Sequence, residues 1–200
     1  MVKDVCVKVD FRFSFHCVSV FEMFSFNQLN SLVQGYIHGD INNCNIIVQR
    51  SDESNSDYVI SGIIDFGDAC KSFYVSELVI IMADLMSSCL GQYEPLTVAN
   101  LIIRGYLMEF TLQKDELKFL RILLCSRLLQ LYILGGEAIR KNPENEYVCL
   151  ELKETMDMCT YLWTLDDDVF IKVVFKDLKK QAYKMYLLPI TNDIILCKLS

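Results

Sequence analysis

Two aspartates and one asparagine in the first third of the sequence have the types and spacing needed to move a phosphoryl group. Asp40 precedes Asn45 by five residues, and Asp65 follows a short apolar run. A carboxylate such as that of Asp40 can accept a proton from a hydroxyl nucleophile. Asn45 and Asp65 offer a neutral and an anionic oxygen, and Mg²⁺ prefers oxygen ligands. Because phosphoryl transfer depends on positioning and on neutralising charge, these three side chains together indicate that chemistry.

Short apolar segments around these residues are expected to form the strands that position them. Residues 36–37 and 46–48 precede and follow a turn-rich segment, and residues 58–64 form a longer apolar run that ends at Asp65. The polar stretch 51–57 is typical of a hairpin loop. The polar side chains would therefore lie in loops at strand ends, where functional residues concentrate.

The spacing matches a known catalytic arrangement. His38, Asp40 and Asn45 form the pattern H-x-D-x-x-x-x-N, and a D-F-G triplet begins at Asp65. Protein kinases carry these two patterns in this order, with the first acid as base and the later groups as metal ligands. The alternative is that these are turn residues capping a hairpin. We disfavour it, because two acids and an amide arise easily by chance but the whole framed pattern does not.

Two polar residues close to the pattern have less direct roles. We expect His38 to order the loop through hydrogen bonds rather than to take part in catalysis. For Asp68 two interpretations stay open. It contacts the metal or the substrate, or it caps a helix that begins near Ser72.

Three charged residues lie in the apolar stretches that follow. Glu77 and Asp84 are seven positions apart and would share one face of a helix, and Arg127 lies within the apolar stretch 120–134. Charges in such surroundings are usually paired, so we expect ion pairs inside the protein. The alternative is substrate binding, with an acid receiving an amine. The candidates for substrate binding are Asp68, Glu77 and Arg127.

After residue 67 the pattern becomes mainly helical, which gives an α+β protein with its strands near the 38–45 segment. We expect helices over residues 73–90, 97–111, 115–141 and from 143 or 145 to about 165, then a strand over 169–175 and a helix over 178–188.

The composition indicates a cytoplasmic protein with a large core. The chain has 200 residues, of which 52% are hydrophobic. No apolar run reaches the roughly 20 residues that span a bilayer, and we expect neither a signal peptide nor a membrane partner. One domain or slightly more is the natural expectation for this length.

Charge and cysteine usage exclude two further classes. A net charge of −7 argues against a nucleic-acid partner, which would favour a basic face. It is compatible with an amine-bearing substrate. Nine cysteines occur with only two histidines and no C-x-x-C pair, so a zinc site is not expected and the thiols are expected to be reduced.

Two details distinguish this pattern from that of protein kinases. Gly39 stands between His38 and Asp40, where protein kinases have arginine, and an apolar helix follows Gly67 without an activation loop. A protein substrate needs that platform, whereas a small molecule does not. In these residues the sequence resembles the aminoglycoside phosphotransferase-like small-molecule kinases, whose motif is H-G-D-x-x-x-x-N followed by I-D-F/W.

The resemblance covers about residues 27–165. It implies a protein-kinase-like C-terminal lobe that is mainly helical, with short strands flanking the catalytic loop. The residues that carry it are His38, Gly39, Asp40, Asn45, 61–66, Tyr74, Val75, Glu77, 125–127 and 143–145.

The resemblance also implies the roles of the polar residues. Asp40 would be the catalytic base, and Asn45 and Asp65 the magnesium ligands. Within the family the chain looks most like members that transfer the γ-phosphate of GTP to the hydroxyl of 5-hydroxylysine. The donor is therefore expected to be GTP or ATP, and an acidic pocket using Glu77 or Asp84 would suit the side-chain amine of the substrate.

The sequence departs from the family before the motif. All eight glycines lie at Gly35 or later, so no glycine-rich loop precedes the motif. Lys8 resembles the phosphate-binding lysine but lies too close to Asp40 for the usual intervening elements. We therefore expect the N-terminal lobe to be missing, with an atypical segment 1–22, a kinase-like lobe 23–168 and an atypical tail 169–200.

Three hypotheses follow from this combination. The chain belongs to a small-molecule kinase, or it is an inactive lobe that binds a substrate, a partner lobe or another copy of itself. The third is a kinase of the same type that acts on choline, ethanolamine or homoserine. A missing lobe would expose apolar surface and favour self-association through that face.

Overall fold

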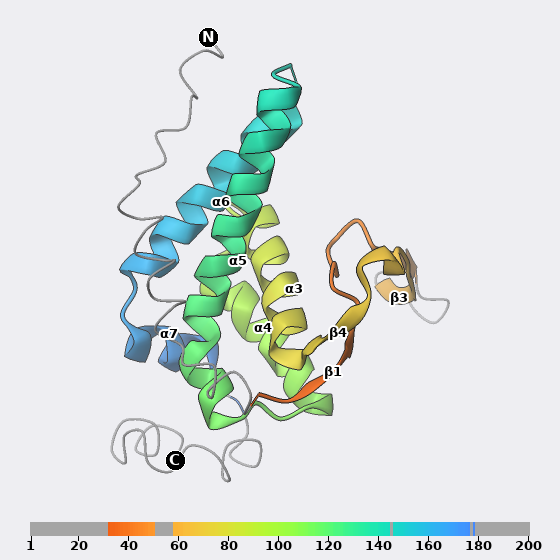
Figure 1. The fold of residues 1–200 in the computed structure, drawn as a ribbon. Coiled ribbons are helices and arrows are strands. Elements are labelled where there is room, and N and C mark those ends of the chain that lie inside the picture. Colours follow the sequence, from red (N-terminus) through yellow and green to blue (C-terminus); the bar gives the residue numbers. More distant parts are fainter. Residues whose placement is uncertain (1–31, 51–57, 145, 177, 179–200) are drawn as a thin grey trace.

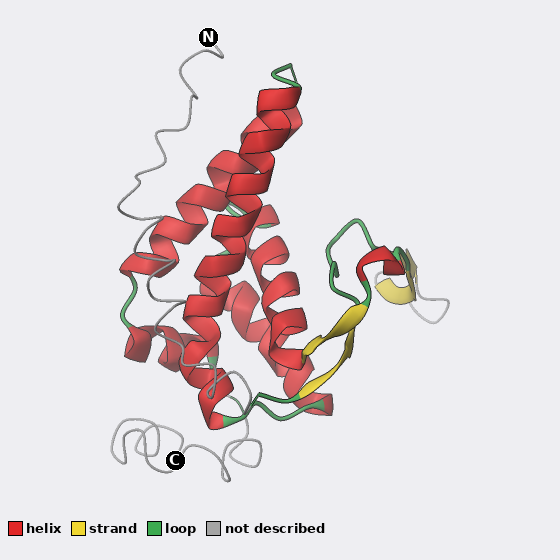
Figure 2. Cartoon of the chain, in the orientation of Figure 1, coloured by secondary structure: helices red, strands yellow, loops and turns green. Residues whose placement is uncertain are grey.

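The computed structural model describes residues 32–50, 58–144, 146–176 and 178. A body of helices carries a smaller β region, which lies to the right of the helices in Figure 1. Figure 2 shows that the strands occur only in that region within the described residues. The expectations for residues 1–31, for the loop 51–57 and for a helix over 178–188 fall outside the described residues, apart from residue 178.

Two antiparallel ladders build the β region. The strand β1 (Gln34–Ile37) pairs with β4 (Cys70–Phe73), and β2 (Ile46–Arg50) pairs with β3 (Tyr58–Ile63). A short 3₁₀ helix, η1 (Phe66–Asp68), lies between β3 and β4. The strands at 46 and 58 were expected, but β4 was not, because its four residues lack an alternating apolar pattern. Its pairing with β1 brings the start of the loop that follows β1 beside η1.

Five helices form the body within the described residues. They are α3 (Tyr74–Ser88), α4 (Pro95–Glu109), α5 (Lys114–Lys141), α6 (Glu146–Thr164) and α7 (Asp167–Val174). The first four confirm the sequence-based helices to within a few residues at each end.

The expected strand over residues 169–175 is wrong, because these residues belong to α7. Valine and isoleucine are frequent there, and β-branched residues favour strands. The helix forms because the Asp166 carboxylate accepts hydrogen bonds from the backbone N–H groups of Asp168 and Val169. Phe170 and Val174, four positions apart, are then both fully buried on one helical face. The division of the chain at residue 168 stays a prediction, although α7 crosses it.

The core surrounds α3, which contacts α4, α5 and α6. This position explains the nearly continuous apolar sequence of α3, since a helix covered on several sides has little need for a polar face. The largest fully buried side chains include Leu78, Met82, Met86, Ile103, Leu120, Leu124, Leu128, Met158, Leu162 and Phe170.

The first turn of α5 contains a buried acid. Glu116 accepts a 2.7 Å hydrogen bond from the backbone N–H of Gln113, which is one half of a capping box. Burial raises the pKa of Glu116, against the opposing effect of backbone hydrogen bonds. Burial, with a smaller contribution from the charge of Glu116, also raises the pKa of Tyr106 to about 12.

No helix in the described part of the chain is long and apolar enough to cross a membrane.

Candidate active site

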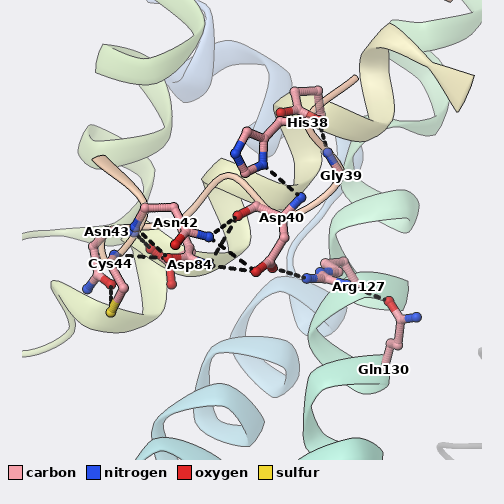
Figure 3. A network of polar contacts seen from close by, with 11 residues as sticks. His38, Gly39, Asp40, Asn42, Asn43, Cys44, Asp84, Arg127 and Gln130 are labelled. Atoms are coloured by element: carbon pink, nitrogen blue, oxygen red, sulfur yellow. Dashed lines mark hydrogen bonds and ion pairs between the residues drawn. The ribbon is translucent and has the colours of Figure 1, made fainter. Parts of the chain in front are cut away.

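The loop of residues 38–45, here called the 38–45 loop, connects β1 to β2 and lies against α3 (Figure 3). Pairing of β1 with β4 places η1 beside its first residues, and pairing of β2 with β3 places residue 64 beside its last. The two ladders therefore bring together the two polar patterns that the sequence separates by about 25 positions.

His38 ties these two patterns together. Its Nε2 donates a 2.8 Å hydrogen bond to the carbonyl of Ile64, and its Nδ1 accepts from the backbone N–H of Asp40 at 3.3 Å. The carbonyl can only accept, so Nε2 carries the proton. The His38 ring is buried and packs against Phe66 with the ring centroids 4.6 Å apart. The expectation that His38 orders the loop by hydrogen bonding is confirmed.

Two amide side chains hold the carboxylate of Asp40. Asn45 Nδ2 donates to the Asp40 carbonyl at 2.9 Å and to Oδ2 at 3.3 Å. Asn42 Nδ2 donates to the same Oδ2 at 3.1 Å, while its Oδ1 accepts from the backbone N–H groups of Cys44 and Asn45. The other carboxylate oxygen, Oδ1, receives neither of these amide bonds.

Asn42 was not singled out in the sequence. Its short side chain bonds to the backbone two and three positions later, which is the behaviour of asparagine in an Asx turn. The feature of the sequence that could have identified Asn42 is its place within the polar run before Asn45.

Asp65 lies close to Asn45 through the backbone. The N–H of Ile64 donates to the carbonyl of Asn45 at 3.0 Å. Asp65 itself has a left-handed backbone with φ of 63°. Among the described residues it is the non-glycine residue with a positive φ. Aspartate tolerates this conformation, and such strained residues concentrate at functional sites.

The oxygens of Asn45 and Asp65 fit a divalent cation. Within the described residues, Asn45 Oδ1 and the Asp65 carboxylate form no hydrogen bond or ion pair, although Asn45 is buried. The Asn45 side chain uses its N–H₂ group to hold Asp40, which leaves its oxygen available. An unengaged amide oxygen and an unengaged carboxylate on two linked segments are the donor types that Mg²⁺ takes in phosphoryl-transfer sites.

Steric contacts explain why glycine occupies the middle position of the H-G-D pattern. Gly39 has φ of +84°, and a Cβ atom there would lie 2.4 Å from the backbone carbonyl oxygen of Asp68. Glycine alone avoids both the left-handed strain and the collision. The close approach of the two backbones sets the distance between the 38–45 loop and η1.

Two acids of α3 hold the loop from its other side. Glu77 Oε2 accepts from the backbone N–H of Gly39 at 3.0 Å, and Asp84 Oδ2 accepts from that of Asn43 at 2.9 Å. Their seven-residue spacing puts both on the face of α3 that meets the loop, as the sequence indicated. The two bonds lie on either side of Asp40 and fix the backbone that carries it. The ion pair expected for Glu77 is absent from the described residues.

Arg127 reaches the site from α5. Its Nη2 lies 3.7 Å from Asp40 Oδ1, and its Nη1 donates to Gln130 Oε1 at 2.9 Å. Its Nε is buried and has no hydrogen-bond partner in the described part of the protein. The expected pairing of Arg127 with an internal acid is confirmed, and its partner is the candidate catalytic base.

Asp68 lies in η1 with an exposed side chain, and its carbonyl approaches Gly39. The helix that follows begins at Tyr74, with Phe73 as its cap, so the capping role considered for Asp68 is wrong. Its role toward metal or substrate stays a prediction.

The 38–45 loop and η1 lie within a segment that matches a known protein family. Residues 18–112 match the sequence profile of APH, the phosphotransferase enzyme family. The chain is similar to this family over that segment. The resemblance to aminoglycoside phosphotransferase-like kinases, drawn from the spacing of the polar residues, is thereby confirmed.

Similar proteins include several hydroxylysine kinases. The mouse protein is 33% identical over 119 residues, which are 58% of this chain and 31% of the mouse protein. The zebrafish protein is 30% identical over 132 residues, 66% of this chain and 36% of that protein. The bovine protein is 32% identical over 111 residues. The chain spans about a third of the length of these relatives.

A solved structure shares the fold. Amicoumacin kinase hAmiN, determined in complex with AMP-PNP, Ca²⁺ and Ami, superposes with a TM-score of 0.52 at 16% identity, over 82% of this chain and 49% of that one. The expected fold class, an α+β kinase-like lobe that is mainly helical, is confirmed.

Proposed function

We propose that this chain is part of a cytoplasmic small-molecule kinase that transfers a nucleotide γ-phosphate to a hydroxyl group. The observation that carries the proposal is the set of contacts in the 38–45 loop. Asp40 is held by two amides, and Asn45 Oδ1 and the Asp65 carboxylate have no hydrogen-bond partner among the described residues.

In this proposal Asp40 is the catalytic base. Its Oδ2 accepts hydrogen bonds from Asn42 and Asn45, which orient the carboxylate. Its Oδ1 lies 3.7 Å from Arg127 Nη2 and would accept the proton of the substrate hydroxyl. His38, Glu77 and Asp84 position it indirectly by fixing the backbone of the loop. Rigid placement of this kind supplies much of the rate enhancement in phosphoryl transfer.

Asn45 and Asp65 would hold Mg²⁺ in this proposal. When bound, the ion neutralises charge on the phosphate oxygens. The left-handed backbone of Asp65 and the bond between Ile64 and Asn45 keep the two ligand residues on adjoining segments. Asp68, one turn further along η1, is the candidate for an additional contact with the metal or the substrate.

The proposed acceptor is 5-hydroxy-L-lysine and the proposed donor is GTP, with ATP as the alternative donor. The support is the similarity to hydroxylysine kinases at 28% to 33% identity. Choline, ethanolamine and homoserine are the alternative acceptors for a kinase of this type.

Purified protein incubated with 5-hydroxy-L-lysine, Mg²⁺ and GTP or ATP tests the proposal through release of nucleoside diphosphate. We expect transfer to 5-hydroxylysine above that to choline or homoserine, and its loss in Asp40→Asn. This variant keeps the size of the side chain but cannot accept the proton. If the wild-type chain shows neither transfer nor a nucleotide-dependent shift of its melting temperature, the proposal fails for this chain.

A second candidate function is a binding module without turnover. The observation that favours it is the exposure of apolar side chains on the β2–β3 hairpin and on η1, where Val48, Ile60 and Phe66 are each more than half exposed. A surface of this kind is suited to contact with another protein lobe. Binding of 5-hydroxylysine without phosphate transfer in the same experiment would support this candidate.

A further inference from the structure

Arg127 approaches the candidate base from a different direction than every other group that holds it. The amides of Asn42 and Asn45 come from the 38–45 loop itself, whereas Arg127 projects from α5 (Figure 3). Its side chain keeps 19% of its surface exposed and that of Asp40 keeps 36%. A ligand that reaches the carboxylate therefore also finds a cation beside it.

The contact between these two side chains is an incomplete ion pair. A charge-assisted hydrogen bond between guanidinium and carboxylate is about 2.7–2.9 Å long, and the strongest form uses two parallel bonds. Here Nη2 lies 3.7 Å from Asp40 Oδ1, and Nε is buried without a partner in the described residues. Among the described residues, Nη1 alone has a hydrogen bond, with the neutral amide of Gln130. The Nε–Nη2 edge of the guanidinium thus has no hydrogen-bonded anion.

We propose that this edge of Arg127 binds the carboxylate of a hydroxy amino acid substrate. The inference rests on the proposed function, because it places the acceptor hydroxyl at Asp40. Guanidinium is the group whose planar pair of donors matches a carboxylate, and in the bound state the buried Nε would turn outward together with Nη2. Gln130, one turn later on α5, holds Nη1 and leaves that edge as the one that turns toward the ligand.

The negative charges around the site favour a cation such as Arg127 next to a substrate carboxylate. Asp40, Asp65 and Asp68 lie on the two segments that form the site, so a substrate carboxylate without a positive partner would be repelled. A buried donor without a partner also costs free energy, which a bound carboxylate recovers. A carboxylate bound at Arg127 would therefore have a positive partner and would also give the buried Nε a hydrogen-bond acceptor.

The dimensions fit an amino acid with a hydroxyl on its side chain. A hydroxyl bonded to Asp40 and a carboxylate bonded to Arg127 can be at most about 9 Å apart, given the 3.7 Å between the two protein atoms and ordinary hydrogen-bond lengths. In 5-hydroxylysine three carbon atoms separate the hydroxyl-bearing carbon from the carboxyl carbon, and with bonds of about 1.5 Å the distance between the two groups stays within this limit. Choline and ethanolamine have no carboxylate to place there.

The test compares two ligands that differ only in this group. Calorimetric titration of the full chain with 5-hydroxy-L-lysine and with 1,5-diaminopentan-2-ol, its decarboxylated form, needs no turnover. We expect the amino acid to bind more tightly to the wild type. Arg127→Gln should weaken its binding by about 10- to 100-fold, as for loss of a hydrogen-bonded charge pair, and leave the diamine unchanged.

Two variants make the result specific. Arg127→Lys keeps the charge without the planar fork and should recover part of the affinity for the amino acid. Arg140→Gln removes an arginine of the same helix, about 20 Å further along α5, and should change neither affinity. Circular dichroism and melting temperature establish that each variant is folded.

The outcomes separate this inference from the proposed function. Equal binding of both ligands to wild type, or an equal loss for both in Arg127→Gln, overturns the role of Arg127 while phosphate transfer still supports the kinase. A wild-type chain that binds neither ligand overturns the acceptor proposed above and this inference together.

Discussion

At the scale of single residues, the site depends on backbone groups as much as on side chains. Gly39 is an example, because its role is to allow a left-handed turn and the close approach of the Asp68 carbonyl. Its N–H group donates to Glu77, so the residue also connects the loop to α3. A position with no side chain therefore determines where the neighbouring Asp40 carboxylate lies.

We predict that Gly39→Ala lowers the free energy of unfolding by about 2 kcal/mol, because alanine is strained at this φ and its Cβ would collide with the Asp68 carbonyl. Urea unfolding followed by circular dichroism measures the change. The matched control is Gly136→Ala in α5, where a Cβ atom meets nothing within 4 Å. There the same substitution should stabilise by up to about 1 kcal/mol, since glycine is a poor helix former. Equal effects of the two substitutions would contradict the prediction.

At the scale of elements, helices supply acids that accept hydrogen bonds from backbone groups. In α3, Glu77 and Asp84 accept backbone N–H groups of the loop. In α5, Glu116 caps the first turn with one oxygen while Oε1 is buried without a hydrogen-bond partner among the described residues. A carboxylate in that position is costly to ionise, which makes the stability of the fold depend on pH.

We predict that Glu116→Gln becomes progressively more stable than the wild type as pH rises. The pKa of Glu116 is raised in the folded protein by burial, so its contribution to stability is full below the unfolded pKa of about 4.3 and is lost as pH rises through the folded value. Glutamine keeps the acceptor for the Gln113 N–H and does not ionise.

Urea unfolding of both proteins between about pH 4 and pH 7 measures this difference, which should be near zero at the acid end. Glu109→Gln, at the exposed end of α4, is the control and should show no such trend. A difference for Glu116→Gln that is independent of pH would show that ionisation of Glu116 does not limit stability.

At the scale of the whole molecule, the β region and the helical body differ in how much of their apolar side-chain surface is buried. The body has a continuous core, whereas most residues of the β2–β3 hairpin are exposed. Val48 and Ile60 are opposite one another in the ladder and are 55% and 66% exposed. A two-stranded sheet with apolar side chains and open edges is a typical place for association.

We predict that the chain self-associates through this hairpin in a concentration-dependent way. The double variant Val48→Lys, Ile60→Lys should shift the sedimentation profile toward the monomer, because charge on exposed strands opposes pairing. The control is Leu101→Lys with Met108→Lys, two exposed apolar residues of α4, which should leave the profile unchanged. A wild-type chain that is monomeric at all concentrations would contradict the prediction.

Local sequence was sufficient for much of the fold. Four of the described helices were predicted because periodic apolar residues and flanking caps are properties of neighbouring positions. The segment 169–175 was mispredicted because its β-branched residues favour a strand, while the Asp166 cap and the burial of Phe170 favour a helix. The strand β4 was missed because only its pairing with β1 makes it a strand.

The spacing from His38 to Asn45 and on to Asp65 was readable from the sequence, since it is a local property that one loop and one hairpin preserve, whereas Asn42 was not singled out. The tertiary structure decided how they are held. Glu77 reaches Gly39 across 38 positions, and Arg127 reaches Asp40 from a helix far along the chain. No local periodicity encodes such contacts, because they form only when the core places α3 and α5 beside the 38–45 loop.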